Sequence, residues 1–264
     1  MTVTESGLRS RPSSTKPWLQ YASPQRFYPI AGKLVPWFMG VALLLSAVGL
    51  YIGFFVAPTD HQQGDAYRII FVHVPVAWLS MVVYVAMAFW AGLGWVLNTR
   101  LSSMMARALA PTGALFTFLA LWTGALWGRP TWGAWWVWDA RLTSELILLF
   151  LYIGFMALQS ASDDPRRGDR AGALLAVVGV VNVPIIYFSV QWWNTLHQGA
   201  SISFKAAPTM ASTMLLGMLL TALGFWAYAI GMALLRLRAI VLEREGDATW
   251  VAELPEVKSV RMGA

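Results

Sequence analysis

The feature that most constrains this chain is a series of six apolar stretches that qualify as bilayer-crossing helices. A hydrocarbon core about 30 Å thick needs roughly 20 apolar residues in a helix. The stretches cover residues 35–56, 69–97, 106–127, 144–158, 171–190 and 209–235. Only 12% of the residues are charged, whereas a soluble domain carries about 25%. The sequence therefore predicts an all-α integral membrane protein with six transmembrane helices.

The apolar stretches divide the chain into three parts. Residues 1–34 are polar and basic and contain scattered aromatic side chains, which suits a cytoplasmic or interfacial leader. No apolar run followed by a small-residue cleavage site occurs there, so we expect no removable signal peptide. Residues 35–242 form the predicted membrane domain, and residues 243–264 a cytoplasmic tail.

The distribution of Lys and Arg predicts the orientation of the six spans. The two termini and the second and fourth connections carry 15 of these residues, and the other three connections carry four. Basic residues accumulate on the cytoplasmic side of a membrane. Both termini should therefore be cytoplasmic, and the first, third and fifth connections should face outward. We interpret the net charge of +6 as a topology signal and expect no nucleic-acid partner.

The third connection, residues 127–143, is rich in tryptophan, with five indoles in twelve residues. One interpretation is an aromatic belt at headgroup depth. A belt spreads its aromatic residues over many helix ends, whereas these are concentrated in one connection with two glycines and a proline. The second interpretation is a surface on which a planar apolar ligand stacks.

All three histidines of the chain lie on the same predicted outer side. His61 is in the first connection, His73 lies about one turn inside the second span, and His197 is in the fifth connection. A neutral imidazole is a good axial ligand for iron, and two approaching from opposite sides would hold a flat metallo-macrocycle. Each histidine can equally be an ordinary hydrogen-bonding residue, and His61, which lies among polar neighbours, suits exposure to solvent.

Three arginines accompany these histidines: Arg68, Arg129 and Arg141. A guanidinium group suits a carboxylate, so these side chains are candidates for binding acidic substituents of a ligand. The alternatives are an ion pair between Arg141 and Asp139 and an interfacial position for Arg68. Asp139 is also a candidate cap for the fourth span, with Glu145 in its first turn as a helix-start charge or an arginine partner.

Several kinds of chemistry are excluded by what the sequence lacks. The chain has no Cys, which rules out disulfides, thiolate metal sites and thioether attachment of a cofactor to this chain. It has no Walker-type glycine loop, His-Glu-x-x-His helix or Gly-x-Ser-x-Gly turn. Any energy from ATP must come from another polypeptide.

Three segments resemble a known family. Residues 132–143 (Trp-Gly-Ala-Trp-Trp-Val-Trp-Asp-Ala-Arg-Leu-Thr) resemble the tryptophan-rich signature of haem-handling proteins in cytochrome c maturation. Residues 67–70 (Tyr-Arg-Ile-Ile) with 73–75 (His-Val-Pro), and residues 192–199 (Trp-Trp-Asn-Thr-Leu-His-Gln-Gly), are similar to the CcmC family within that group. The resemblance extends from about residue 35 through the sixth span.

The resemblance implies a bacterial inner-membrane protein that binds haem b at its periplasmic face and passes it to the haem chaperone CcmE. It implies an ABC transporter (CcmA and CcmB) and the small subunit CcmD as partners. His73 and His197 match the axial-ligand positions. The positions that match the haem-binding signature are Trp132, Trp135, Trp136, Trp138 and Asp139. His61 matches no ligand position.

We expect this chain to position haem, with no side chain acting as a conventional acid or base. Two alternatives stay open from sequence. A haem ligase acting directly on apocytochrome would need a site for a Cys-x-x-Cys-His segment. A haem or small-solute permease would need a polar pathway through the spans, for which Glu145 and Asn182 are the only evident internal polar residues.

Overall fold

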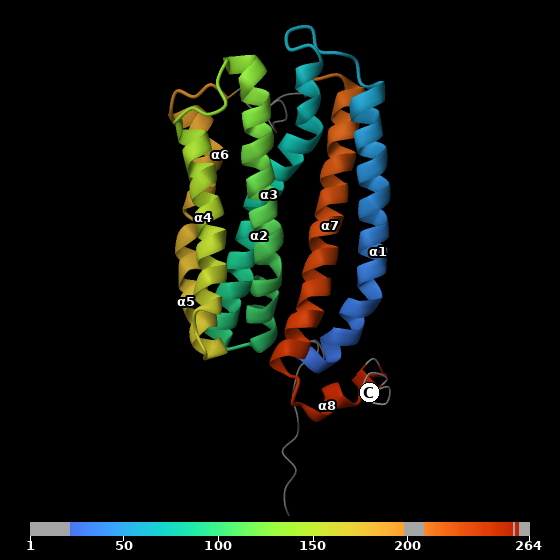
Figure 1. Cartoon of the computed structure of the whole chain (residues 1–264), viewed down its shortest axis with the longest axis vertical. Helices are drawn as coiled ribbons and strands as arrows, with labels where there is room; N and C mark the ends of the chain where they lie inside the picture. Colours follow the sequence, from blue (N-terminus) through green and yellow to red (C-terminus); the bar gives the residue numbers. More distant parts are fainter. Residues whose placement is uncertain (1–21, 198–208, 256, 259–264) are drawn as a thin grey trace, which may run out of the picture.

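The computed structural model describes residues 22–197, 209–255, 257 and 258. Most of these residues form helices that run side by side along the long axis (Figure 1). Six helical segments of the described residues are long and apolar enough to cross a membrane, and no strand occurs among those residues. The predicted six-span, all-α fold class is confirmed.

The helices are numbered in chain order together with two short segments, a π-helical turn η2 and a 3₁₀ turn η3 (Figure 1). Their bounds are α1 Pro24–Tyr51, η2 Ile52–Val56, η3 Asp65–Ile69, α2 Ile70–Leu97, α3 Arg100–Trp132, α4 Ala140–Ser160, α5 Pro165–Gly179, α6 Asn182–Trp192, α7 Ser212–Arg244 and α8 Thr249–Ala252.

Several helices extend beyond the predicted apolar stretches. Their first and last turns carry polar residues, which a search for apolar stretches does not include. α1 begins at Pro24, inside the predicted leader, where Oγ of Ser23 accepts a hydrogen bond from the backbone N–H of Arg26 at 3.3 Å. Pro24 suits the first helical position because its missing N–H has no partner to lose there. Earlier leader residues, and Lys205 in the fifth connection, lie outside the described residues.

The fifth span is built from two helices, α5 and α6, separated at Val180 and Val181. Pro184 lies in the first turn of α6 and has no N–H to donate to the carbonyl of Val180. The N–H of Val183 donates to that carbonyl instead, at 3.0 Å. The break therefore leaves this carbonyl satisfied inside the membrane, as an apolar surrounding requires.

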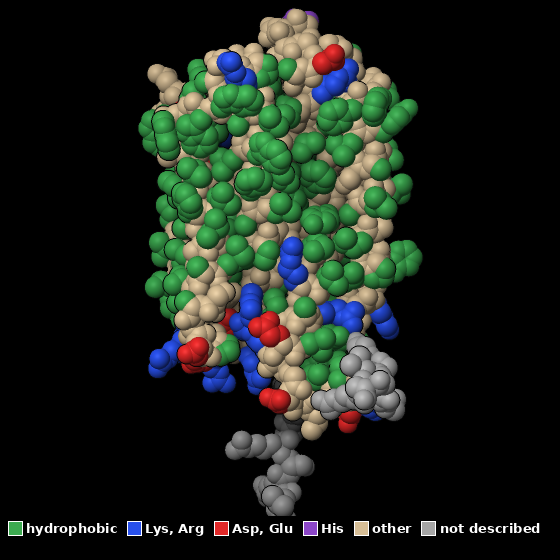
Figure 2. All heavy atoms as spheres, viewed as in Figure 1, with side chains coloured by type: hydrophobic (Ala, Val, Ile, Leu, Met, Phe, Trp, Pro, Cys, Tyr) green, Lys and Arg blue, Asp and Glu red, His purple; other side chains and the backbone are tan. Residues whose placement is uncertain are grey.

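Two helix pairs organise the bundle: α1 packs along α7, and α2 packs along α3. α4 and α5 complete a core with α2 and α3 around buried aromatic residues such as Tyr84, Tyr152 and Phe155. The side of the molecule seen in Figure 2 is a broad apolar belt, with most of the Lys and Arg side chains at its lower end. The first and third connections lie at the opposite, upper end (Figure 1).

Gly49 sets the separation of α1 and α7. A Cβ at this position would lie 2.6 Å from the backbone nitrogen of Thr221 and 2.8 Å from the carbonyl oxygen of Gly217. Backbone atoms cannot rotate away, so the two helices would have to move apart. Gly40, on the same helix, has no atom within 4 Å of the equivalent point.

We therefore predict that Gly49→Val weakens the α1–α7 contact, at a cost of about 1–3 kcal/mol. Gly40→Val is the matched control and should unfold like the parent protein. Thermal unfolding of the purified proteins in one detergent measures the difference. Equal midpoints for the two variants would contradict this account of the packing.

Candidate functional site

The start of α2 and the end of α6 lie at the upper end of the bundle (Figure 1). His73, near the start of α2, and His197, which follows α6, are therefore at the same end. The two imidazoles are close enough to interact electrostatically, and the guanidinium group of Arg141 interacts with both. Two residues far apart in the sequence thus share one site. His61 is exposed in the first connection.

The hydrogen bonds of His73 determine which of its ring nitrogens carries the proton. Its Nδ1 lies 2.9 Å from Oγ1 of Thr123 on α3. That hydroxyl lies 2.6 Å from the carbonyl oxygen of Leu119 and donates its only proton there. Thr123 must then accept from Nδ1–H of His73, which leaves a lone pair on Nε2. Gly124 leaves room for the ring, since a Cβ there would lie 3.1 Å from Cε1 of His73.

A carboxylate orients His197 in the same way, with Nδ1 hydrogen-bonded and Nε2 free. Its Nδ1 lies 3.3 Å from Oδ2 of Asp139. An ionised carboxylate only accepts hydrogen bonds, so Nδ1 carries the proton and Nε2 again keeps its lone pair. Burial lowers the pKa of His197 below its ordinary value, and the nearby Asp139 opposes this with a smaller effect. The ring is therefore neutral at neutral pH, the form that ligates a metal.

Asp139 serves the fold and the site together. Its Oδ1 accepts a hydrogen bond from the backbone N–H of Leu142 at 2.8 Å, so Asp139 is the N-cap of α4, as expected. Its other oxygen holds His197. The start of α4 therefore fixes the position of the second imidazole.

The predicted loop of residues 127–143 is wrong at both ends, because α3 continues through Trp132 and α4 begins at Ala140. Pro130 lies in the last turn of α3 and costs that turn a single backbone bond. Thr131 stabilises the turn by donating its hydroxyl to the carbonyl of Trp127 at 2.7 Å. Gly133, with φ +78°, ends the helix in the left-handed conformation that favours glycine.

The tryptophans of this segment fall into two groups. Trp127 packs edge-on against His73, with ring centroids 5.6 Å apart, and Trp132 packs against His197 at 4.8 Å. Trp136 and Trp138 pack against each other at 5.3 Å. Trp135 and Trp138 are 57% and 77% exposed. One group thus supports the imidazoles. In the other, Trp135 and Trp138 are exposed at the surface, and Trp136 is half-buried against Trp138.

The three predicted arginines have different surroundings. Arg141 is half-buried, and its Nη1 donates to the carbonyl of Ile186 at 3.1 Å. Arg129 is exposed and donates from Nη1 to the carbonyl of Gly133. Arg68 pairs with Asp65 at 2.9 Å and donates to two carbonyls at the end of the first span, those of Gly53 and Ala57. Arg68 therefore holds the first connection together.

Sequence reasoning missed Thr123 and the role of Gln63. The side-chain amide oxygen of Gln63 accepts a hydrogen bond from Nε1 of Trp127 at 2.7 Å, which ties the first connection to the indole beside His73. Thr123 and Trp127 are four residues apart and so lie on one face of α3. The four-residue spacing was the one sequence feature that links Thr123 to Trp127. It identifies Thr123 as a partner of His73 only once α2 is known to pack against this face of α3.

Among the described residues no group of three or more His, Asp or Glu side chains gathers in a form that could hold a bare metal ion. A metallo-macrocycle supplies its own equatorial ligands and needs only axial ones. The two imidazoles at this end of the bundle are candidates for that role. The fold and the site therefore define a class: six-span membrane proteins that present paired histidines and a tryptophan cluster at one end of the bundle.

Comparison with known proteins gives this class a family. A family model described as "Heme exporter protein C" matches residues 17–252. Heme exporter protein C of Haemophilus influenzae is 48% identical over 240 residues, which cover 90% of this chain and 98% of that protein. Its counterpart in Escherichia coli K12 is 47% identical and covers 89% of this chain and 95% of its own length.

A further relative, the putative cytochrome c biosynthesis ccmC-like mitochondrial protein of Marchantia polymorpha, is 47% identical over 165 residues, or 62% of this chain and 70% of that protein. The chain belongs to the heme exporter protein C family. The resemblance inferred from the sequence is confirmed.

The double role of Asp139 leads to a prediction about stability. Asn caps helices about as well as Asp, whereas Ala loses the cap at a cost of about 1 kcal/mol. Asp139→Asn should therefore unfold close to the parent temperature, and Asp139→Ala should unfold earlier. Thermal unfolding in detergent distinguishes them. If the Asn variant is destabilised as much as the Ala variant, the cap is not what Asp139 contributes to the fold.

Proposed function

We propose that this chain binds haem at the end of the bundle that holds His73 and His197 and transfers it to the haem chaperone CcmE during cytochrome c maturation. Haem is then cargo, held for a time and passed on. The observation that carries the proposal is the pair of imidazoles whose Nδ1 atoms are occupied by Thr123 and Asp139. Both rings keep Nε2 available for iron.

Partners on Nδ1 are typical of histidines that bind metals, because they fix the ring orientation and raise the basicity of the ligating nitrogen. Here one partner is a neutral hydroxyl and the other a carboxylate. The Nε2 atoms of the two histidines therefore differ in basicity, and that of His197 would be the stronger electron-pair donor to iron. A pair of unequal axial ligands suits a protein that must release its cargo.

The indoles supply the apolar surface that haem needs. Trp132 packs against His197, and Trp136 packs against Trp138. Trp135 and Trp138 are exposed, and a bound porphyrin would stack on their faces. An exposed patch of large apolar side chains is typical of a binding surface. A vinyl edge of the macrocycle would remain accessible to a nucleophilic histidine of the chaperone. The N–H of that histidine would add across the vinyl double bond, so the covalent bond would form on the partner while this chain positions the substrate.

Arg129 and Arg141 are the stronger candidates for binding the haem propionates. Each uses one guanidinium nitrogen for a backbone carbonyl and keeps further N–H donors. Arg68 would have to give up its bonds to Gly53 and Ala57 to take part. Its proposed contribution is therefore to hold the first connection over the site.

The proposed setting is the inner membrane of a bacterium, with the haem site facing the periplasm and both termini in the cytoplasm. The supporting observation is the excess of Lys and Arg at the end of the bundle opposite the histidines (Figure 2). The sequence contains no nucleotide-binding motif, so the proposal includes the ABC transporter subunits CcmA and CcmB and the small subunit CcmD as partners.

The contacts of the internal polar residues give no support to the permease alternative. Glu145 is buried and accepts a hydrogen bond from the hydroxyl of Ser80 at 2.8 Å. Asn182 is buried and donates to the carbonyl of Ser144 at 2.9 Å. Both side chains join neighbouring helices, which explains their presence without a solute pathway. The structure likewise offers no observation that favours direct ligation to apocytochrome.

We predict that His73→Ala and His197→Ala each change the absorption spectrum of bound haem and abolish formation of haem-loaded chaperone. His61→Ala is the matched control, since it removes an exposed imidazole from the same end of the bundle. The spectrum is recorded on protein purified with its membrane partners, and loading is measured on the chaperone. Normal loading by the His73→Ala, His197→Ala double variant would refute the axial-ligand proposal.

The orientation is tested separately with reporter fusions. A fusion in the α4–α5 connection at Asp163 should report a cytoplasmic location, and one in the α1–α2 connection at Gln62 a periplasmic location, because basic residues retain their flanking segments in the cytoplasm. Alkaline phosphatase and a fluorescent protein that fails to mature outside the cytoplasm give opposite readouts. The reverse pattern would put the histidine end on the cytoplasmic side.

A further inference from the structure

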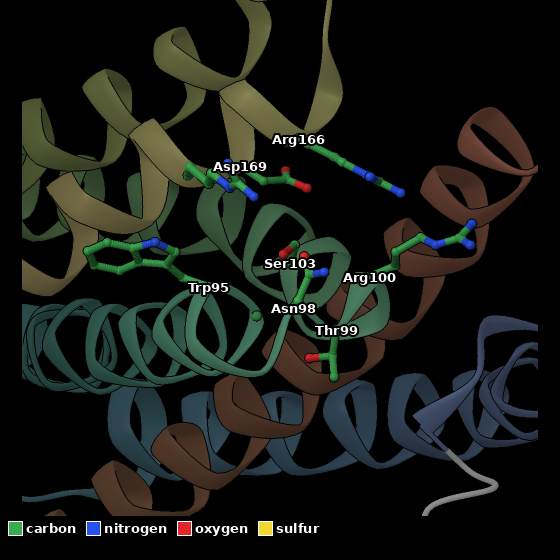
Figure 3. Close-up of a pocket in the computed structure, with 9 residues that line it drawn as sticks. Trp95, Asn98, Thr99, Arg100, Ser103, Arg166 and Asp169 are labelled. Carbon is green, nitrogen blue, oxygen red and sulfur yellow. The ribbon is translucent and has the colours of Figure 1, made fainter.

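At the end of the bundle opposite the histidines, a cavity of about 250 Å³ lies where α2 ends and where α3 and α5 begin. Figure 3 shows Asp169 on α5 across from Ser103 and Asn98, with Arg166 extending toward the edge where Arg100 lies and Trp95 at the other edge. This cavity is far from the candidate haem site along the bundle and has no part in the proposed function.

The lining of the cavity is strongly basic, with three guanidinium groups from Arg100, Arg166 and Arg170. Within the part of the chain that the structure describes, the side chains of Arg166 and Arg170 have no hydrogen-bond or ion-pair partner. Arg100 approaches Glu245 at 3.4 Å but is 68% exposed, so this pair contributes little. Arg166 and Arg170 are therefore available to a ligand, and Arg100 can contribute at the small cost of its exposed pair with Glu245.

The acidic residue in the lining, Asp169, does not neutralise these arginines. Both of its carboxylate oxygens are bound by Arg244 of α7, at 2.7 Å and 2.8 Å, and one of them also accepts from Gln159. This bidentate ion pair with Arg244 neutralises the charge of Asp169. The cavity therefore carries a net positive charge and suits an anion.

The start of α3 adds to this preference. Thr99, the N-cap of α3, donates its hydroxyl to Oγ of Ser102 at 2.8 Å and makes no side-chain bond to the backbone of the first turn. First-turn N–H groups that lack a capping side chain add partial positive charge at a helix start. Ser103 contributes a further hydroxyl to the lining.

The flanks of the cavity are apolar and face outward. On α2, Trp95, Val96 and Leu97 are 46%, 78% and 60% exposed, and on α5 Leu174, one turn from Arg170, is 53% exposed. In a bilayer such side chains contact acyl chains, with the indole at headgroup depth. A ligand with an anionic head and an apolar tail matches both parts of this surface.

We propose that this cavity binds the phosphate of an anionic phospholipid, with the guanidinium groups around the headgroup and the acyl chains along Trp95 and Leu174. Basic pockets between transmembrane helices bind such headgroups in other membrane proteins. Inorganic phosphate shares the charge but lacks the tail. The apolar flanks favour the lipid.

The test measures binding of phosphatidylglycerol and phosphatidylcholine to the full-length, delipidated protein in detergent by native mass spectrometry. Arg166→Gln and Arg170→Gln should each weaken phosphatidylglycerol binding about fivefold, the loss expected for one basic residue at a lipid surface. Arg167→Gln is the matched control, because Arg167 lies on the same helix, is 84% exposed and does not line the cavity. Its binding should equal that of the parent protein.

Three outcomes would overturn the proposal. Equal binding of phosphatidylglycerol and phosphatidylcholine by the parent protein would show that charge is not recognised. Equal weakening by all three Gln variants would show a general attraction of the basic surface. Displacement of the lipid by millimolar inorganic phosphate would identify a free anion as the ligand. Circular dichroism of each variant confirms that a loss of binding does not reflect unfolding.

Discussion

The structure depends on one constraint: hydrocarbon offers no hydrogen-bonding partner, so a polar group inside the bundle is costly unless it bonds to another helix or to its own backbone. Among the described residues, the buried hydroxyl of Tyr84 is an exception. Ser80 illustrates the constraint, since its hydroxyl contacts Glu145 and its carbonyl accepts from the phenol of Tyr152 at 2.7 Å. α2 and α4 are joined by both contacts. Arg236 and Thr112 join α7 to α3 in the same way. Each bond fixes the relative position of two helices more specifically than apolar packing does.

The same constraint builds the candidate haem site. An unpaired imidazole in a span is costly, and the bond to Thr123 removes that cost on one side of the ring of His73. The other ring nitrogen keeps its lone pair. His197 and Asp139 repeat this arrangement outside the spans. Under the proposed function, the bonds that satisfy one ring nitrogen leave the other free to ligate iron, so stability and haem binding would rest on the same bonds.

Sequence alone predicted the six spans well, because a span requires a long apolar run and little else. It also identified His73, His197 and Asp139, which the structure brings to the same end of the bundle. It failed where two signals compete. The third apolar stretch ends at residue 127, yet α3 continues through Trp132, because the one backbone bond that Pro130 lacks near a helix end costs little. Thr123 could not be identified, since its importance depends on which helix packs against α3.

Arginine shows how burial and neighbours, more than residue type, decide what a charged side chain does in this protein. Arg68 and Arg244 are committed to fixed partners, the one to carbonyls of the first span and the other to Asp169. Both therefore stabilise connections between elements. In the part of the chain that the structure describes, the side chains of Arg166 and Arg170 make no hydrogen bond or ion pair. Both are exposed at the cavity, beside the apolar side chains of α2 and α5. These two charges belong to the basic excess that predicts the membrane orientation, and their place in a cavity whose acid is already neutralised also makes them available to the proposed lipid headgroup.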